Sequence, residues 1–160
     1  MSRSTRTADP YRDLGMIDSR APRFNQTVIA LVALIAVATG WWWLLALLAA
    51  NLASGLALGR RYCVTCVFYF AVIQPRIGEG PLEDSRPPRA ANIVGFVFLT
   101  AASAAYAAGV GILGGALAVT VAALALLAAV SGFCTGCEAY KLGCRLRGHP
   151  FESCPLPPRA

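Results

Sequence analysis

Long uncharged stretches alternate with short charged segments along this 160-residue chain. The 14 basic and 8 acidic residues all lie outside two windows, residues 26–59 and 90–132. Each window exceeds the roughly 20 apolar residues that a helix needs to span a bilayer. Charged residues make up 14% of the chain, whereas an ordinary soluble domain has about 25%. The pattern therefore predicts an all-α integral membrane protein.

The second window is too long for a single membrane-spanning helix. At about 1.5 Å per residue it would extend about 63 Å, twice a hydrocarbon core of about 30 Å. We therefore expect a turn in the glycine-rich segment 109–115. Gly40 is expected to take the same role in the first window, with the three tryptophans that follow it at the membrane interface. The expected spans lie near residues 24–39, 41–59, 91–108 and 114–133.

The positions of the basic residues indicate how these spans are oriented. Arginines and lysines precede the first span, separate the second from the third, and follow the fourth, while both hairpin turns are uncharged. Four spans place every basic residue on one side, which the positive-inside rule makes the cytoplasm. We expect a multi-pass protein of the inner (plasma) membrane with both termini cytoplasmic. The scattered arginines carry no nucleic-acid-binding motif, so lipid rather than nucleic acid is the expected partner.

The two halves of the chain present the same motifs in the same order. Each half begins with Pro-Arg, at residues 22–23 and 88–89, continues through an apolar window, and ends in an aromatic-Cys-x-x-Cys-x-x-Tyr motif. Such self-similarity is typical of an internal repeat, so we predict two duplicated helical hairpins, four transmembrane helices in all. The expected organisation is a disordered basic segment at 1–21, repeats at 22–73 and 88–147, a Pro- and Gly-rich linker at 74–87, and a disordered tail at 148–160.

Four of the six cysteines form two Cys-x-x-Cys motifs, Cys63–Cys66 and Cys134–Cys137. All are expected in cytoplasmic segments, where thiols stay reduced, so structural disulfides are not expected. Three interpretations remain open: redox or sulfur-transfer thiols, a metal site, or copied residues without chemistry. For thiol chemistry, the two arginines before Cys63 favour a thiolate there, whereas Glu138 disfavours one at Cys137. Cys134 is then the expected attacking thiol of its motif.

A metal site and a carrier are the alternatives to thiol chemistry. The four thiols together would complete an all-thiolate tetrahedron for zinc or hold an iron–sulfur cluster, if the halves face each other about an axis along the membrane normal. Cys144, His149 and Cys154 could extend such a site. A small transporter of sulfur species or reducing equivalents would need polar groups inside the membrane. Asn51 is the one strongly polar side chain near mid-membrane, and we expect it instead to join the two hairpins by an interhelical hydrogen bond.

Three further motifs give the chain a likeness to known sequences. They are Pro22-Arg23-Phe24-Asn25-Gln26, Leu82-Glu83-Asp84 with Pro87-Pro88-Arg89, and the segment from Gly132 to Tyr140. With them the chain, over roughly residues 17–142, resembles an uncharacterised bacterial membrane-protein family catalogued as a domain of unknown function. The resemblance implies a four-span protein that is often associated with thioredoxin-like or sulfurtransferase proteins, and no established activity. Relatives tend to carry Tyr-Ser-Pro-like residues at Cys63 and Cys66, so it favours Cys134–Cys137 and argues against a four-cysteine site general to the family.

From the sequence we predict a cytoplasm-facing thiol/disulfide or sulfur-relay protein that works with a soluble thioredoxin-like or sulfurtransferase partner. Cys134 would attack, Cys137 would resolve the mixed disulfide, and Cys63 with Cys66 would form a second pair able to relay. The sequence leaves open the substrate and whether the chain forms a homo-oligomer.

Overall fold

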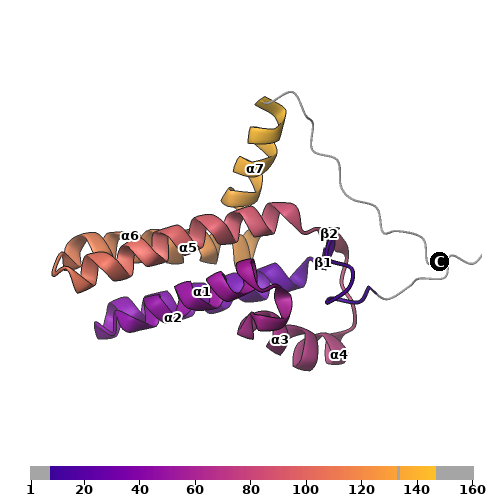
Figure 1. The fold of residues 1–160 in the computed structure, drawn as a ribbon, viewed down its shortest axis with the longest axis horizontal. Helices are drawn as coiled ribbons and strands as arrows, with labels where there is room; N and C mark the ends of the chain where they lie inside the picture. Colours follow the sequence, from indigo (N-terminus) through magenta and orange to yellow (C-terminus); the bar gives the residue numbers. More distant parts are fainter. Residues whose placement is uncertain (1–7, 133, 147–160) are drawn as a thin grey trace, which may run out of the picture.

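Four apolar helices lie side by side and form the body of the molecule in the computed structural model, which describes residues 8–132 and 134–146 (Figure 1). They are α1 (Arg20–Thr39), α2 (Trp43–Ala57), α5 (Arg86–Ala107) and α6 (Gly111–Ser131). Shorter elements gather at one end of this bundle: β1 (Met16–Asp18), the 3-10 turn η1 (Arg60–Tyr62), α3 (Val64–Phe68), the π-helical turn η2 (Tyr69–Ile73), α4 (Gln74–Ile77) and β2 (Leu82–Asp84). The amphipathic helix α7 (Thr135–Leu146) projects away from the bundle at that end.

Three of the helices, α1, α5 and α6, are long and apolar enough to cross a membrane. The expected span at residues 41–59 is present as α2, but that helix has only 15 residues. At about 1.5 Å per residue it rises about 22 Å, less than a hydrocarbon core of about 30 Å. The structure thus confirms a helical protein with helices of membrane-spanning length, and it shortens the second expected span at both ends.

The two long hairpins turn at the end of the bundle opposite the short elements. Gly40 ends α1 in the left-handed conformation, with φ of 75°, as predicted for this turn. The second turn uses only part of the glycine cluster, because Gly109 alone has positive φ there (79°) and α6 already begins at Gly111. Gly114 instead makes room for Tyr106, since a Cβ at this position would lie 2.5 Å from the tyrosine ring.

Each hairpin packs mainly against the other hairpin. Helix α1 contacts α6, and α2 contacts α5, more extensively than α1 contacts α2. Small buried residues, among them Ala33 of α1, Ala102 of α5 and Ala118 of α6, line these interfaces and let the helices approach closely. The shared core therefore forms only when both halves of the chain are together.

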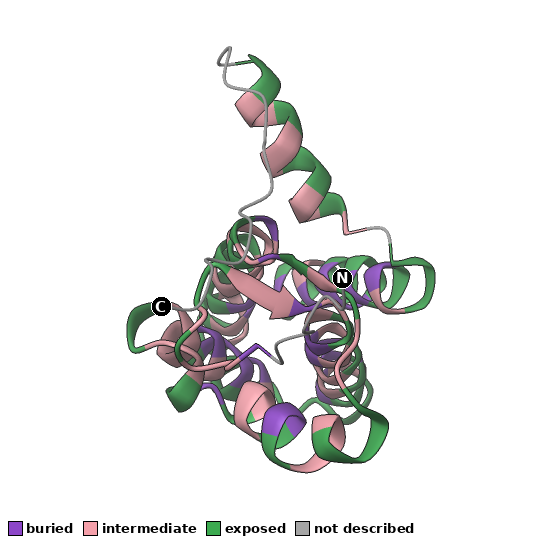
Figure 2. Cartoon of the chain, turned by 90° about the vertical axis from the view of Figure 1, so that its right-hand side faces the viewer, coloured by how far each residue is buried: buried purple, intermediate pink, exposed green. Residues whose placement is uncertain are grey.

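A two-stranded antiparallel sheet joins the halves at the end of the bundle, near the centre of the end-on view (Figure 2). Ile17 lies opposite Glu83, with Met16 opposite Asp84 and Asp18 opposite Leu82. This sheet falls in segments for which the sequence predicts no structure. In the segment 1–21, residues 8–21 form a turn, β1 and the start of α1. In the linker 74–87, α4, β2 and the first turn of α5 are ordered. The tail 148–160 lies outside the described residues.

Candidate dithiol sites

Both Cys-x-x-Cys motifs stand at the start of a helix, and we call Cys63–Cys66 the first pair and Cys134–Cys137 the second pair. Cys63 directly precedes α3, and its carbonyl accepts a hydrogen bond from the Val67 N–H at 2.9 Å. Cys134 directly precedes α7, and its carbonyl accepts from the Glu138 N–H at 3.0 Å. The second cysteine of each pair therefore lies in the first helical turn, close to the thiol of the first.

The second pair combines one acidic thiol with one that stays protonated. A hydrogen bond from the Cys137 thiol lowers the pKa of Cys134 to about 6, and burial opposes this only partly. The backbone N–H of Cys137 also points to the Cys134 sulfur, at 3.4 Å. The same thiol–thiol hydrogen bond, with burial, raises the pKa of Cys137. At neutral pH the pair therefore holds a thiolate at Cys134 beside a thiol at Cys137.

The first pair likewise combines one thiol of lowered pKa with one of raised pKa, but the groups around the acidic thiol differ. A hydrogen bond from Cys66 lowers the pKa of Cys63 to about 6, and the Thr65 hydroxyl lies 3.1 Å from the Cys63 sulfur. The two preceding arginines do not act on Cys63 in the way expected from the sequence. The hydrogen bond with Cys63 and burial raise the pKa of Cys66, and the charge of Arg60 opposes this only in part. Arg61 lies over the ring of Tyr11, 5.6 Å from its centroid.

The two pairs differ in access. The Cys63 side chain is buried, with 4% of its surface exposed, whereas Cys134 and Cys137 are both partly exposed. Leu14, in the segment ahead of β1, lines the same pocket as the first pair, and Arg60 holds this segment in place. Its guanidinium donates to the carbonyls of Met16 at 2.8 Å, Leu14 at 2.9 Å and Pro10 at 3.1 Å.

A buried aspartate fixes the helix that carries the first pair. Oδ2 of Asp18 accepts from the Tyr69 hydroxyl at 3.1 Å and from the Gly80 N–H at 3.0 Å. Its Oδ1 accepts from the Arg20 N–H at 2.9 Å, at the start of α1. Since Tyr69 follows Cys66 by three residues, Asp18 sets the position of the first pair relative to α1.

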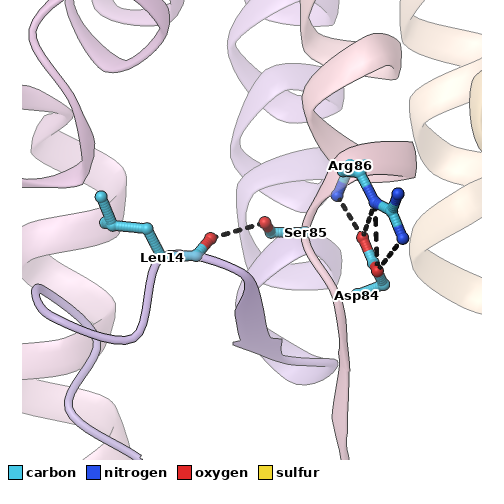
Figure 3. Close-up of polar contacts among 4 residues, drawn as sticks. All are labelled: Leu14, Asp84, Ser85 and Arg86. Atoms are coloured by element: carbon cyan, nitrogen blue, oxygen red, sulfur yellow. Dashed lines mark hydrogen bonds and ion pairs between the residues drawn. The ribbon is translucent and has the colours of Figure 1, made fainter. Parts of the chain in front are cut away.

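Asp84 stands in the corresponding place in the second half. Its carboxylate accepts from the Arg86 N–H at 2.8 Å and pairs with the Arg86 guanidinium, also at 2.8 Å (Figure 3). Tyr140, three residues after Cys137, lies within electrostatic range of Asp84 and Arg86. The Ser85 hydroxyl next to Asp84 donates to the Leu14 carbonyl at 2.6 Å and so binds the segment ahead of β1 (Figure 3).

Sequence reasoning assigned no structural role to either aspartate, although a signal was present. The segments 18–23 and 84–89 read Asp-Ser-Arg-Ala-Pro-Arg and Asp-Ser-Arg-Pro-Pro-Arg, a longer match than the Pro-Arg on which the repeat was based. In both places the aspartate accepts the backbone N–H two residues ahead, which stabilises the start of a long helix.

A chain of amide and hydroxyl groups connects the first pair to the second half. Oδ1 of Asn51 accepts from the Val64 N–H at 2.9 Å, and its Nδ2 donates to the Thr65 hydroxyl at 3.3 Å. Thr65 donates to Asn25 at 2.7 Å, and Asn25 donates to Asn92 of α5 at 3.4 Å. The expected role of Asn51 is therefore corrected: it holds α3 against α2, and Asn25 with Asn92 makes the link between the hairpins.

Each pair borders a pocket to which the opposite half contributes an arginine. The first pocket, of about 300 Å³, contains the first pair and Arg89 of α5. The second pocket, of about 310 Å³, contains the second pair and Arg23 of α1. The Arg89 guanidinium donates to the Leu56 carbonyl at 3.2 Å, and that of Arg23 packs against Gly132. Both arginines thus reach the C-terminal end of the other half's second helix.

The structure does not bring the four thiols of the two pairs together. Within residues 8–132 and 134–146, no three Cys, His, Asp or Glu side chains lie close enough to hold a metal ion. The two pairs are therefore separate sites there. Cys144 lies on α7, where its thiol shares a hydrogen bond with Tyr140, while His149 and Cys154 fall outside the described residues.

Comparison with known proteins agrees with the likeness seen in the sequence motifs. No curated protein and no solved structure matches the chain. A family model matches residues 17–145, a range that contains the four-helix bundle, both cysteine pairs and the strand pair except Met16. The chain belongs to the family described as Domain of unknown function (DUF4395).

Proposed function

We propose that this protein is a membrane-embedded dithiol protein that exchanges electrons or sulfur with a soluble thioredoxin-like or sulfurtransferase partner. The arrangement of the second pair supports this most directly. Attack on a disulfide needs a thiolate, and resolution needs a second thiol nearby that is still protonated. Cys134, with a pKa of about 6, and Cys137, with a raised pKa, meet these two needs.

The exchange has two steps. The Cys134 thiolate attacks one sulfur of the partner's disulfide, whose S–S bond breaks, so that a mixed disulfide forms and one partner thiolate is released. Cys137 then loses its proton and attacks the Cys134 sulfur, which forms the internal disulfide and releases the partner's second thiolate. Two electrons pass from the pair to the partner. In the sulfur-transfer variant, Cys134 takes the terminal sulfur of a partner persulfide and the partner leaves as a thiolate.

The proposed topology has four spans with both termini and both pairs on the cytoplasmic side. The support is that the strands and the elements that carry both pairs and the described basic residues gather at one end of the bundle, whereas the two uncharged turns lie at the other (Figure 1). The exposed Trp41, Trp42 and Trp43 beside Gly40 suit the distant interface and would let the short α2 cross with local thinning of the bilayer. We also propose that the two halves arose by duplication.

The two pairs have different roles in this proposal. The second pair is partly exposed and would meet the soluble partner, while Cys63 is buried. The first pair would return two electrons to the oxidised second pair, or accept sulfur from it, and so serve as a relay.

Trapping of the mixed disulfide tests the proposal. The protein is reduced in lipid nanodiscs and mixed with an oxidised thioredoxin-like protein that carries a Cys-x-x-Cys disulfide. Cys137→Ser should accumulate a covalent adduct through Cys134, because the resolving thiol is gone, while the wild type should form its internal disulfide and release the partner. Cys144→Ser is the matched control on the same helix and should behave as the wild type. Exchange at the wild-type rate by Cys134→Ser would refute the proposal.

A further inference from the structure

The pockets beside the two pairs are alike in size and opposite in charge. The second pocket is lined by three carboxylates and two cations: Glu83, Asp84, Glu138, Arg23 and Lys141. The first pocket is lined by two arginines, Arg60 and Arg89, and by no carboxylate from the described part of the chain. Between these two pockets, only the first has an excess of positive charge.

The cations of the second pocket have carboxylates close by. Lys141 pairs with Glu138 at 2.8 Å, and Arg23 shares the pocket with Glu83 and Asp84. An anion that entered this pocket would meet like charges, which costs free energy at short range.

Among the described residues, the arginines of the first pocket donate hydrogen bonds only to neutral groups. Every hydrogen bond of the Arg60 guanidinium goes to a backbone carbonyl, and that of Arg89 goes to the Leu56 carbonyl. Neither arginine makes an ion pair within residues 8–132 and 134–146. Burial lowers the pKa of Arg60, which reflects the cost of holding this cation away from water. A bound anion would offset that cost.

Unused donors point to the kind of anion. A guanidinium carries five N–H donors in a planar fork, and Arg60 spends three of them on carbonyls while Arg89 spends one. Asn92 also lines this pocket, and its Oδ1 is already taken as an acceptor from Asn25, so its amide can contribute N–H donors. Several donors around a space of about 300 Å³ suit a group with several oxygen acceptors, as in an oxyanion.

We propose that the first pocket binds a tetrahedral oxyanion, a sulfur oxyanion or a phosphate, next to Cys63. Arg89 from α5 and Arg60 from η1 hold it, so the site needs both halves of the chain. The site shares Cys63 with the proposed thiol exchange but does not depend on that reaction. The bound oxyanion is either a small free anion or the phosphate of a lipid headgroup.

Charge-selective alkylation tests the site without any exchange reaction. Iodoacetate and iodoacetamide both alkylate thiolates, but only iodoacetate is an anion. In nanodiscs of zwitterionic lipid, the iodoacetate-to-iodoacetamide rate ratio is measured at Cys63 and at Cys134 by mass spectrometry of the peptides. We expect the ratio at Cys63 to exceed that at Cys134 by about threefold or more, the size expected of a partly exposed charge interaction.

Two arginines in matching positions provide the variant and its control. Arg89→Gln should remove most of the preference at Cys63, and added sulfate should do the same in the wild type, whereas Arg23→Gln should leave Cys63 unchanged. If an anionic phospholipid abolishes the preference at Cys63 and leaves the iodoacetate-to-iodoacetamide ratio at Cys134 unchanged, the occupant is the phosphate of that lipid. If the preference survives there and thiosulfate or sulfate abolishes it, the occupant is a free anion.

Calorimetric titration with sulfate gives a second readout should Cys63 be closed to both reagents. Binding weakened about threefold or more by Arg89→Gln, and unaffected by Arg23→Gln, supports the site. Equal ratios at Cys63 and Cys134, equal effects of the two variants, or no sulfate binding in zwitterionic lipid would overturn it. A protein that keeps the preference but exchanges no disulfide contradicts the proposed function alone.

Discussion

The thiol of Cys137 should control the acidity of Cys134, and removing this thiol by Cys137→Ala tests this directly. Its hydrogen bond is the largest cause of the lowered pKa of Cys134, followed in the same direction by the backbone N–H groups of Cys137 and Gly136. Cys137→Ala removes the first contribution and keeps the backbone ones. The titration midpoint of Cys134 should therefore rise from about 6 to above about 7 without returning to 9.0. Cys137→Ser, whose hydroxyl can still donate, should keep the midpoint nearer 6.

The expected gain in reaction rate from the lowered pKa is small, so the titration midpoint rather than a single rate must be measured. At pH 7 a thiol with a pKa of about 6 is about 90% thiolate, whereas one at 9.0 is about 1% thiolate, a ratio of about 90. The intrinsic nucleophilicity of a thiolate falls with its pKa, by about 20-fold over this range. The net gain in rate is thus only about fourfold, small enough for steric access to hide it.

Alkylation of Cys134 by iodoacetamide is therefore followed over pH 4 to about 10 in nanodiscs, with mass spectrometry to isolate the peptide. The wild-type rate should rise through a midpoint near 6 and stay flat above about 7.5, because the thiolate is then fully formed. An unchanged midpoint in Cys137→Ala would show that the thiol–thiol hydrogen bond does not set the acidity of Cys134. A wild-type midpoint near 8.5 would refute the electrostatic reasoning for both pairs.

Three other changes test the surroundings of the pairs. Gly136→Ala should displace α7 and destabilise its packing by about 1–3 kcal/mol, because the new Cβ would lie 2.8 Å from Cα of Ala91. The displacement is measured as faster alkylation of the thiols on α7. Gly143→Ala is the control and should have no such effect, since a Cβ there would meet open space. Asp18→Asn should lower thermal stability in detergent by about 1–3 kcal/mol, since one of its oxygens becomes a donor facing the Tyr69 hydroxyl and other donors; an unchanged melting temperature would contradict this role. Chelation of protein purified without chelators should free no additional thiols; one metal per chain, with four thiols released, would favour a metal centre over two separate dithiols.

The features that could be predicted from sequence are those that repeat over many residues. Two uncharged windows are long enough to identify apolar helices, and a glycine such as Gly40 stands out between them as a turn. The Cys-x-x-Cys spacing itself predicts the two pairs. These signals come from local composition and chain length, so they survive without knowledge of the tertiary contacts.

The features that could not be predicted depend on contacts between distant segments. Strands β1 and β2 have three residues each, too few for an alternating pattern, and they lie in charged segments that read as linkers. Asp18 and Asp84 carry no sign of burial in the sequence, because the partner of Asp18 at Tyr69 is 51 residues away. Likewise the acidity of Cys63 comes from Cys66 and Thr65 within its own turn, whereas sequence proximity pointed to the arginines before it.

The exchange of arginines between the halves links the fold to the chemistry of both pairs. Helix α1 packs against α6 and α2 against α5, so the N-terminal turn of each half's first helix meets the C-terminal end of the other half's second helix. Arg23 and Arg89 are carried to the opposite pair by this packing, whichever chemistry each pair performs. Because the arginines correspond in position, the contrast between the pockets must come from their neighbours: Glu83, Asp84 and Glu138 in one, and Arg60 in the other. A shared architecture with different charged neighbours is the arrangement expected if one pair meets the soluble partner and the other handles an anion.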